Sequence, residues 1–445
     1  MTTAGHAEGA LFVEASAPLS GSVVASPSKS HTLRALLFAS LANGRSSIGS
    51  WLRSPDTQAM VRACQLLGAR IEPAGDRLVV EGVAAAPCIP DDVIHAGNSG
   101  QVLRFVAAIG AHLPGYMVLT GDHSIRHRRP LAPLIEGLKG LGAFALSTKG
   151  DGHAPLVVGG PWQCGTTECD GDDSQPVSAL LIASAFARGL TKVSVRQLGE
   201  KPWVGLTLHW LRRLGVEVDC RTTWRGTTEI SEYAVQGRGS DIRGFDYDVP
   251  GDFSSIAFPV AAALITGGAL TIHGVDLDDV QGDKAVLDVM RCMGAKLHHD
   301  AVNKTLFVQE NCRLSGVTAD INDHIDSICV LSALACFAQG RTVLSGAAIA
   351  RSKESDRIAV MATQLARLGA TIQPTDDGLV IDGDAPLRGA VVEACDDHRV
   401  AMALALAGLG AAGRTTVRGT DCIGKSYASF VSDMNAVGAR MAPAA

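Results

Sequence analysis

A six-fold internal repeat is the sequence feature that most constrains how this chain can fold. A hydrophobic residue, a glycine and a small residue recur at intervals of 69 to 79 residues. The glycines of this pattern are Gly68, Gly142, Gly215, Gly294, Gly369 and Gly438. Each follows a helix-like segment and precedes a strand-like one, where the backbone needs a positive φ and glycine is favoured. The spacing predicts six copies of one unit made of helices and strands.

A second landmark keeps the same period: a helix of small residues, then a glycine and a strand. Residues 177–187 before Gly189 and residues 328–338 before Gly340 are examples. The predicted unit is therefore helix–strand–helix–strand–strand, about 75 residues long. Three such units make one domain of ordinary size, so the chain is predicted to be an α/β protein of two domains.

The last unit is short, because only seven residues follow Gly438. The strand-like segments 9–15 and 21–26 are candidates to complete it. We therefore expect residues 27–246 to form one domain, and residues 1–26 with 247–445 to form the other. The chain then crosses between the domains near residues 24–28 and near 245–250. Two adjacent crossings form a hinge, which favours closure over a ligand.

Composition excludes several classes of function. A net charge of −6 argues against a general nucleic-acid or membrane-surface role. Eleven cysteines without C-x-x-C or a His/Cys cluster predict buried, reduced thiols in a cytoplasmic protein and no metal site. The N-terminus lacks the basic region of a signal peptide. The longest uncharged run, residues 253–272, contains Pro259 and two adjacent glycines, which predicts a buried helix and a strand rather than a membrane span.

Polar residues mark the predicted start of the first helix in every unit, at residues 28–34, 97–104, 172–176, 251–255, 323–327 and 396–399. Each start carries a residue suited to N-capping, and free N–H groups there favour an anion. Capping alone explains the starts at Asp252 and Ser327. Cations lie at the other starts or on loops, namely Lys29, Arg34, Arg104, Arg126, Arg128, Arg129, Lys201, Arg399 and Lys425. This set predicts small, multiply anionic ligands held between the two domains.

Residues 351–357 include five charged residues, in a chain that is only 19% charged. Lys353 and Arg357 are four residues apart, so on a helical turn they would share a face and suit a phosphate or a carboxylate. Glu354 between them could carry a working proton. Taken alone, the run also fits a solvated helix start with ion pairs. No G-x-x-x-x-G-K-[ST] or G-x-G-x-x-G loop is present, so a nucleoside triphosphate or dinucleotide is not indicated.

These motifs, in this order, resemble those of the 5-enolpyruvylshikimate-3-phosphate synthase (3-phosphoshikimate 1-carboxyvinyltransferase) family along nearly the full chain. The matching stretches are residues 27–34, 97–104, 129–130, 174–175, 201–202, 251–255, 281–283, Asp326, 351–357, 397–399 and 425–426. The resemblance implies an enolpyruvyl transferase fold, an inverse α/β barrel of two domains with three repeated units each. It also implies that the domains close over their substrates.

The resemblance further implies transfer of the enolpyruvyl group of phosphoenolpyruvate to the 5-hydroxyl of shikimate 3-phosphate, with release of phosphate. Phosphoenolpyruvate is expected at Lys29, Gly100, Arg129, Gln175, Arg357, Arg399 and Lys425. The shikimate part is expected at Ser30, Arg34, Ser174, Asp326 and Lys353, and Asn98 and Arg104 complete the predicted binding set. The reaction needs two carboxyl groups in separate environments, and we assign Asp326 as base for the hydroxyl and Glu354 as proton shuttle, with Lys29 assisting.

The same resemblance implies no metal or organic cofactor, no nucleic-acid or membrane partner, a monomer, a cytoplasmic location and glyphosate sensitivity. Four positions depart from the family pattern. Asp173 and Glu200 stand where serine is common, Trp203 stands where tyrosine is common, and Gln101 stands where threonine is common. An acidic residue beside a bound phosphate weakens binding unless it is protonated, turned away or paired, for example with Lys201.

Two alternative functions remain open at this stage. One is an enolpyruvyl transferase for another hydroxylated acceptor, which Asp173 and Glu200 motivate. The other is a metabolite-binding homologue without activity, which the presence of both Asp326 and Glu354 disfavours. A UDP-sugar acceptor is disfavoured because residues 121–130 contain no cysteine, whereas the related enzyme of cell-wall synthesis has one in this loop.

Overall fold

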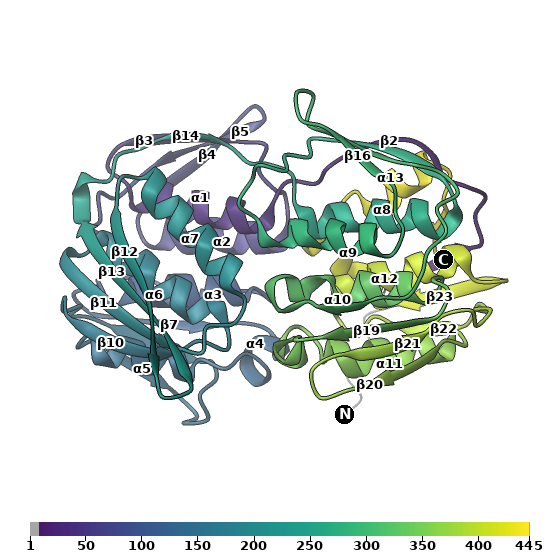
Figure 1. The fold of residues 1–445 in the computed structure, drawn as a ribbon. Coiled ribbons are helices and arrows are strands. Elements are labelled where there is room, and N and C mark those ends of the chain that lie inside the picture. The colour runs from purple at the N-terminus through teal and green to yellow at the C-terminus, as the bar shows by residue number, and fades with distance from the viewer. Residues whose placement is uncertain (1–8, 445) are drawn as a thin grey trace, which may run out of the picture. The chain divides into compact units, whose positions relative to one another are not determined.

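The computed structural model describes residues 9–444, which divide into two compact units (Figure 1). The N-terminal unit is Pro27–Val249. The C-terminal unit comprises the described residues up to Ser26 and those from Pro250 onward. Each unit contains three four-stranded sheets, and each sheet has one parallel and two antiparallel strand pairs.

In the N-terminal unit the sheet orders are β14-β3-β5-β4, β6-β7-β9-β8 and β10-β11-β13-β12. The strands are β3 (Arg45–Gly49), β4 (Arg70–Ala74), β5 (Arg77–Glu81), β6 (Ile94–His95), β7 (Tyr116–Thr120), β8 (Phe144–Ser147), β9 (Leu156–Gly159), β10 (Thr166–Asp170), β11 (Arg188–Arg196), β12 (Glu217–Arg225), β13 (Thr228–Arg238) and β14 (Asp246–Asp248). The helices are α1 (Lys29–Leu41), α2 (Pro55–Leu66), α3 (Gly100–Gly110), α4 (His123–His127), α5 (Ala132–Gly140), α6 (Ser174–Phe186) and α7 (Lys201–Arg213).

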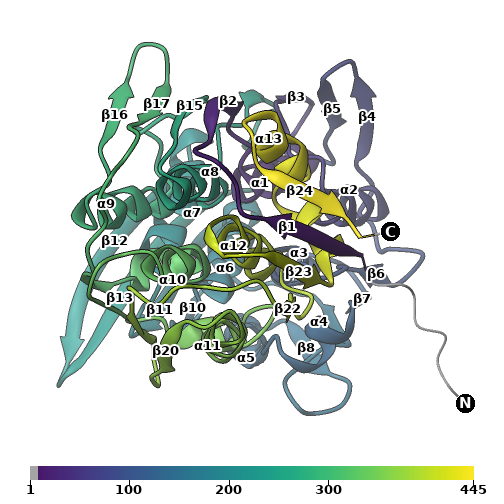
Figure 2. The same ribbon diagram turned by 90° about the vertical axis from the view of Figure 1, so that its right-hand side faces the viewer.

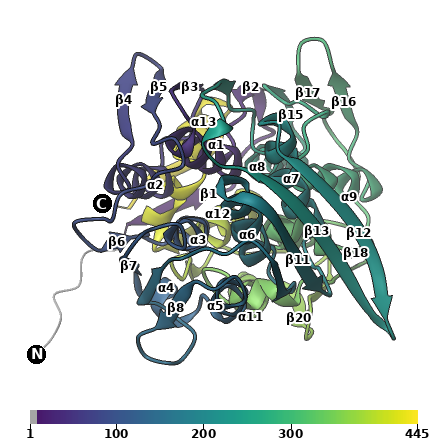
Figure 3. The same cartoon turned by 90° about the vertical axis from the view of Figure 1, so that its left-hand side faces the viewer.

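The core of the N-terminal unit consists of α1, α3 and α6, whose residues are almost all buried (Figure 3). Helix α3 packs against both α1 and α6. These helices are buried on every side, and their polar residues are concentrated in the first two turns. Their small residues let them approach closely.

In the C-terminal unit the sheet orders are β16-β17-β15-β2, β18-β19-β21-β20 and β22-β23-β1-β24. The strands are β1 (Ala10–Glu14), β2 (Ser20–Val24), β15 (Ala269–His273), β16 (Leu297–Asp300), β17 (Thr305–Val308), β18 (Thr318–Asp320), β19 (Arg341–Ser345), β20 (Thr371–Pro374), β21 (Leu379–Asp382), β22 (Val391–Glu393), β23 (Arg414–Arg418) and β24 (Arg440–Pro443). The α-helices are α8 (Phe253–Thr266), α9 (Val286–Cys292), α10 (Ile328–Ala335), α11 (Arg357–Arg367), α12 (His398–Gly410) and α13 (Phe430–Ala436).

Helices α8, α10 and α12 contact one another and form the centre of the C-terminal core (Figure 2). Four short 3₁₀ helices, η2 (Gly282–Ala285), η3 (Asn322–Ser327), η4 (Ala348–Ser352) and η5 (Thr420–Lys425), connect its elements. The uncharged run 253–272 forms α8 and most of β15, a helix and a strand as the sequence predicts. Among the described helices, none has both the length and the apolar character needed to span a lipid bilayer.

Two strands belong to a different unit from the helix that follows them in the sequence. Strand β2 precedes α1 in sequence but lies parallel to β15 in the C-terminal unit. Strand β14 precedes α8 but lies parallel to β3 in the N-terminal unit. The N-terminal unit therefore ends at Val249 rather than at residue 246, because the backbone hydrogen bonds of β14 join it to β3.

The repeat glycines adopt the predicted backbone conformation. All six have φ between 72° and 110°, directly after helices α2, α5, α7, α9, α11 and α13. The predicted unit lacks one element of the real one, a strand of two to five residues before each central helix, such as β6 or β18. Four of these strands have only two or three residues, which is too short for a detectable alternating pattern, whereas β2 corresponds to the predicted segment 21–26.

Candidate active site

The starts of the central helices carry the predicted caps, with one exception. Side chains of Ser28, Ser99, Asp173, Asp252 and Asp397 accept backbone N–H bonds in the first turns of α1, α3, α6, α8 and α12. Ser327 makes no such bond, so the capping predicted there is wrong. Its hydroxyl lies 2.8 Å from Nδ1 of His324 instead, because η3 runs directly into α10.

Arg357, the first residue of α11, is the centre of a charged cluster in the C-terminal unit. Its side chain is 1% exposed and touches three carboxylates, those of Asp326 at 2.6 Å, Glu354 at 2.8 Å and Asp397 at 2.8 Å. Burial lowers the pKa of Arg357, but the carboxylates outweigh burial and raise that pKa well above its ordinary value. The guanidinium is therefore permanently charged and held in one position.

Asp326 is shared between two guanidinium groups. One oxygen accepts from Nη1 of Arg357, and the other lies 2.8 Å from Nη2 of Arg399. Burial raises the pKa of Asp326, but the positive charges of Arg399, Arg357 and Lys353 outweigh burial and hold that pKa below its ordinary value. The carboxylate is consequently ionised in the ligand-free protein.

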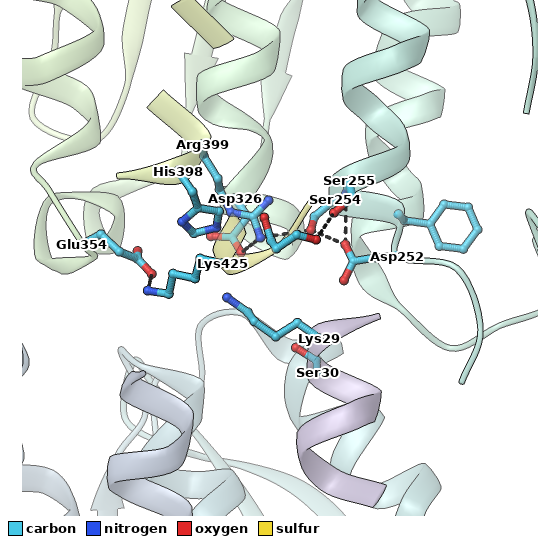
Figure 4. A network of polar contacts seen from close by, with 12 residues as sticks. Lys29, Ser30, Asp252, Ser254, Ser255, Asp326, Glu354, His398, Arg399 and Lys425 are labelled. Atoms are coloured by element: carbon cyan, nitrogen blue, oxygen red, sulfur yellow. Dashed lines mark hydrogen bonds and ion pairs between the residues drawn. The ribbon is translucent and has the colours of Figure 1, made fainter. Parts of the chain in front are cut away.

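Glu354 lies in the loop between η4 and α11, and cations hold both of its oxygens. Oε2 accepts from Nη2 of Arg357, and Oε1 accepts from Nζ of Lys425 at 2.7 Å (Figure 4). Lys353 is buried beside this loop, but its φ of −84° and ψ of −149° are not helical. The prediction that Lys353 and Arg357 share a helical face is therefore wrong, because α11 begins only at Arg357.

Arg399 connects the starts of two central helices. It lies in the first turn of α12, and its Nη2 donates to Oγ of Ser254 in α8 at 3.0 Å. Ser254 in turn donates to the carboxylate of Asp252 (Figure 4). Within residues 9–444, the buried Nη1 of Arg399 has no hydrogen-bond partner. A buried donor of this kind is costly unless a ligand accepts from it.

In the N-terminal unit, four of the predicted residues meet at the start of α3. Nη1 of Arg104 donates to Oε1 of Gln175 at 2.8 Å. A Cβ placed on Gly100 would lie 2.9 Å from each of these two atoms and 3.8 Å from Nη1 of Arg129. Arg104 also contacts Asp173 at 3.1 Å. The glycine therefore lets two guanidinium groups and an amide converge beside the N-terminus of a helix.

A second group lies at the start of α1. Lys29 is 3.6 Å from the buried carboxylate of Asp56. The hydroxyl of Ser30 accepts from Nε2 of Gln101 at 3.0 Å. Arg34 donates to Thr207 from two nitrogens, at 3.2 and 2.9 Å.

The charge of Arg34 has no carboxylate partner in the described chain. The residue is 2% exposed, and its guanidinium lies 5.0 Å from the ring centre of Phe105 and forms no ion pair within residues 9–444. Burial lowers the pKa of Arg34 to about 9. A buried cation held only by neutral groups suits an anionic ligand.

The remaining predicted residues are engaged within the protein. Nδ2 of Asn98 donates to Asp122 at 2.5 Å. Ser174 donates its hydroxyl to Glu200 at 3.1 Å. Lys201 pairs with Glu229 at 2.8 Å and not with Asp173, which Arg104 neutralises instead.

Sequence reasoning gave no role to three residues that organise these groups. Asp397 holds Arg357, Thr207 holds Arg34, and Glu200 holds Ser174. The position of Asp397 beside Arg399, and the departure of Glu200 from the family pattern, were the available signals. No signal marked Thr207, since one hydroxyl within a helix usually bonds to its own backbone. Over residues 9–444, no group of three or more His, Cys, Asp or Glu side chains is arranged to hold a metal ion.

Known proteins resemble this chain over nearly its full length. The sequence model of the family described as EPSP synthase (3-phosphoshikimate 1-carboxyvinyltransferase) matches residues 13–434. The 3-phosphoshikimate 1-carboxyvinyltransferase of Acetivibrio thermocellus is 40% identical over 420 residues, which cover 94% of this chain and 96% of that protein. The protein of the same name from Methanocella arvoryzae is 40% identical over 423 residues, covering 95% and 97%.

Solved structures give the same picture of the fold. The EPSP synthase of Acinetobacter baumannii superposes with a TM-score of 0.81 at 27% identity, covering 98% of this chain and 100% of that one. The enolpyruvyl transferase NikO from Streptomyces tendae superposes with a TM-score of 0.78 at 20% identity, covering 99% of each chain. The second likeness concerns the fold alone.

Proposed function

Since the chain belongs to the EPSP synthase family, we infer that it transfers the enolpyruvyl group of phosphoenolpyruvate to the 5-hydroxyl of shikimate 3-phosphate and releases phosphate. The protein is accordingly a transferase of the shikimate pathway, which leads to chorismate and the aromatic amino acids. The assignment of roles to individual residues below is our proposal.

Phosphoenolpyruvate carries a carboxylate and a phosphate, so its site needs several fixed cations. We assign to it Lys29, Gly100, Arg129, Gln175, Arg357, Arg399 and Lys425, with Arg104 and Asn98 fixing their surroundings. The unpartnered Nη1 of Arg399 supports this assignment, because the ligand would supply the acceptor that the described chain lacks. The glycine at position 100 supports it too, since a Cβ there would collide with Arg104 and Gln175.

We assign Ser30, Arg34, Ser174, Asp326 and Lys353 to the acceptor. Arg34 provides the main support, because its buried charge has no carboxylate partner in the described chain and an anionic acceptor would supply one. The hydroxyl of Ser30 accepts from Gln101, which leaves its proton for a ligand oxygen.

The chemistry requires two proton movements. The acceptor oxygen attacks C2 of phosphoenolpyruvate as the methylene C3 takes up a proton, which gives a tetrahedral intermediate. C3 then returns a proton as the bond from C2 to the phosphate oxygen breaks. We assign the C3 proton to Glu354 and the hydroxyl proton to Asp326, with Lys29 assisting. The surrounding cations stabilise the charge of the intermediate and of the departing phosphate.

The low pKa of Asp326 bears on this mechanism. A carboxylate between two guanidinium groups is ionised and ready to accept a proton, but it is a weak base. An anionic substrate bound to Arg357 and Arg399 would share their positive charge and so raise the basicity of Asp326. In this proposal the base becomes effective only after phosphoenolpyruvate has bound.

The observation that carries the proposal is the cluster of Asp326, Glu354 and three cations on α11, α12 and η5. A continuous assay of phosphate release with phosphoenolpyruvate and shikimate 3-phosphate tests it. We expect turnover that depends on both substrates, whereas a purified, folded protein without such turnover would contradict the function. The monomeric state and the cytoplasmic location are predictions for size-exclusion chromatography and cell fractionation.

A further inference from the structure

We propose that Glu200 determines how tightly the acceptor binds, because its carboxylate occupies the anion-binding position at the start of α6. An anionic group of the acceptor would have to displace this carboxylate before it could bind Ser174. The proposal rests on the assignment of Ser174 to the acceptor site above. It predicts that the Glu200 carboxylate competes with the acceptor for Ser174.

The geometry at Ser174 supports an internal anion. Oε2 of Glu200 accepts both the backbone N–H of Ser174, at 3.2 Å, and its hydroxyl, at 3.1 Å. Both residues are 2% exposed. The next amide, that of Gln175, donates to Asp173 at 3.0 Å. The first two N–H groups of α6 thus donate to carboxylates of the protein itself. At other helix N-termini such groups commonly donate to a bound anion.

The start of α1 shows the opposite arrangement. There the hydroxyl of Ser30 accepts from Gln101, so its own proton is available for another acceptor. The neighbouring Arg34 has no carboxylate partner within residues 9–444. The start of α1 therefore presents donors and a positive charge to a ligand, whereas the donors at the start of α6 are already used by a negative charge.

The carboxylate of Glu200 serves α6 and not its own helix. Glu200 stands at the N-cap position of α7 but makes no capping hydrogen bond there. Its φ of 46° and ψ of 40° lie in the left-handed region, which a residue with a side chain adopts only at an energetic cost. A strained backbone combined with a buried carboxylate on a ligand-binding serine indicates a functional rather than a capping role.

A direct competition follows from these contacts. A phosphate oxygen and the Glu200 carboxylate would both accept from the backbone N–H and the hydroxyl of Ser174, and their like charges repel each other. The competition weakens the binding of the acceptor and leaves phosphoenolpyruvate unaffected. Glu200 thereby reduces the contribution of the acceptor's phosphate group to binding.

Two substitutions test the proposal. Glu200→Gln keeps the size of the side chain and removes its charge, and Glu200→Ser also removes its reach to Ser174. We expect the KM and the Kd for shikimate 3-phosphate to fall about tenfold in each, the effect of one charge-assisted hydrogen bond. The KM for phosphoenolpyruvate should change by less than about twofold, because the proposed competition concerns only a hydrogen bond to the acceptor. Glu229→Gln, which removes a carboxylate from the neighbouring Lys201, is the matched control and should behave like the unsubstituted protein.

An unchanged or higher KM for shikimate 3-phosphate in a folded Glu200 variant overturns the proposal. If only one of the two variants folds, that variant alone decides the test. Thermal unfolding in increasing inorganic phosphate gives a reading that is independent of turnover. The Glu200→Gln protein should be stabilised at a lower phosphate concentration than the unsubstituted protein, and equal responses also count against the proposal. If the unsubstituted protein releases no phosphate with both substrates, the proposed function fails, while calorimetry and the phosphate titration still decide the role of Glu200.

Discussion

Glu354 and Lys425 lie 71 residues apart in the sequence and are joined by an ion pair of 2.7 Å between Oε1 and Nζ. The second oxygen of Glu354 is held by Arg357 at 2.8 Å. Both acidic oxygens are thus fixed by cations on different elements, the start of α11 and the end of η5. Such a carboxylate is well positioned but must exchange a cation contact for a substrate contact when it transfers a proton.

The substitution Glu354→Gln separates positioning from proton transfer. The amide retains the size of the carboxylate but cannot shuttle a proton, so we expect kcat to fall by about 10²- to 10⁴-fold. Binding of both substrates should persist, because the cations that hold them remain. Calorimetry measures the binding, and phosphate release measures kcat. Glu310→Gln, an exposed carboxylate of the same unit, should be unchanged, and normal turnover of Glu354→Gln would remove Glu354 from the mechanism.

The sequence was sufficient for the repeat and for the cations but not for their partners. A glycine after a helix has a local reason to be there, and Gly68 and Gly438 have the positive φ that this reason predicts. The position of β1 between β23 and β24 was also predictable, because the last unit lacked a strand. Strand β2 instead pairs with β15 in another sheet of the same unit, so it does not complete the last repeat as predicted. Ion pairs depend on which loops meet in space, so Asp173 has Arg104 as its partner and not the nearby Lys201.

Local patterns also failed where one element runs into another. Ser327 is the last residue of η3 and already has helical φ and ψ, so its side chain is not placed to cap α10. Lys353 precedes the first turn of α11, so the four-residue spacing to Arg357 has no helical meaning there. In both cases the charge or polarity of the residue was read correctly, and the backbone conformation was not.

Asp397 is predicted to be essential for stability as well as for the site. Its side chain is 0% exposed and holds the buried guanidinium of Arg357 with two hydrogen bonds, at 2.8 and 3.3 Å. Asp397→Ala removes the most buried of the three carboxylates around that charge and also the side-chain cap of α12, so we expect the free energy of unfolding to fall by about 3 to 5 kcal/mol. Urea denaturation followed by circular dichroism measures the loss.

The exposed pair of Asp382 with Arg341 is the matched control for this prediction. Both side chains of this pair are well exposed, at 39% and 65%. Asp382→Ala should therefore change the free energy of unfolding by less than about 1 kcal/mol, as solvent screens the pair. Equal losses in the two variants would show that Asp397 does not compensate a buried charge.

His112 is predicted to make stability depend on pH in the mildly acidic range. It follows α3, its Nε2 lies 2.9 Å from the carbonyl oxygen of Ala183 in α6, and its ring stacks on Trp162 at 5.0 Å. Burial lowers the pKa of His112 from 6.5 to about 4. Between pH 6.5 and pH 4, His112 is therefore protonated in the unfolded chain but neutral in the folded protein. The free energy of unfolding is highest above pH 6.5 and falls by about 3 kcal/mol as the pH decreases toward 4.

The substitution His112→Gln tests this dependence, because an amide can donate to Ala183 without titrating. Urea unfolding midpoints are measured for both proteins between pH 7 and pH 4.5. The unsubstituted protein should lose more stability than the variant over this range, while at pH 7 the two should differ little. Parallel pH profiles would show that His112 is not the group responsible.

Arg34 is predicted to contribute to ligand binding and little to the stability of the ligand-free protein. Its buried guanidinium is held by Thr207 and by backbone carbonyl oxygens, without a carboxylate in the described chain. Removing such a charge also removes its cost of burial, which offsets the lost hydrogen bonds, so Arg34→Met should change the free energy of unfolding by less than about 1 kcal/mol. The affinity for shikimate 3-phosphate should fall by about 100-fold, because a buried cation then no longer faces its anion.

Arg213→Met is the matched control, since Arg213 also lies over an aromatic ring, at 4.9 Å from Tyr247, but is exposed near the end of α7. Thermal unfolding measures stability and calorimetry measures the affinity for each substrate. Arg213→Met should leave the affinity for shikimate 3-phosphate unchanged. If Arg34→Met unfolds the protein at a much lower temperature, Arg34 is structural and its assignment to the acceptor is wrong. If it retains normal stability and full affinity, the anion of the acceptor must be bound by other residues.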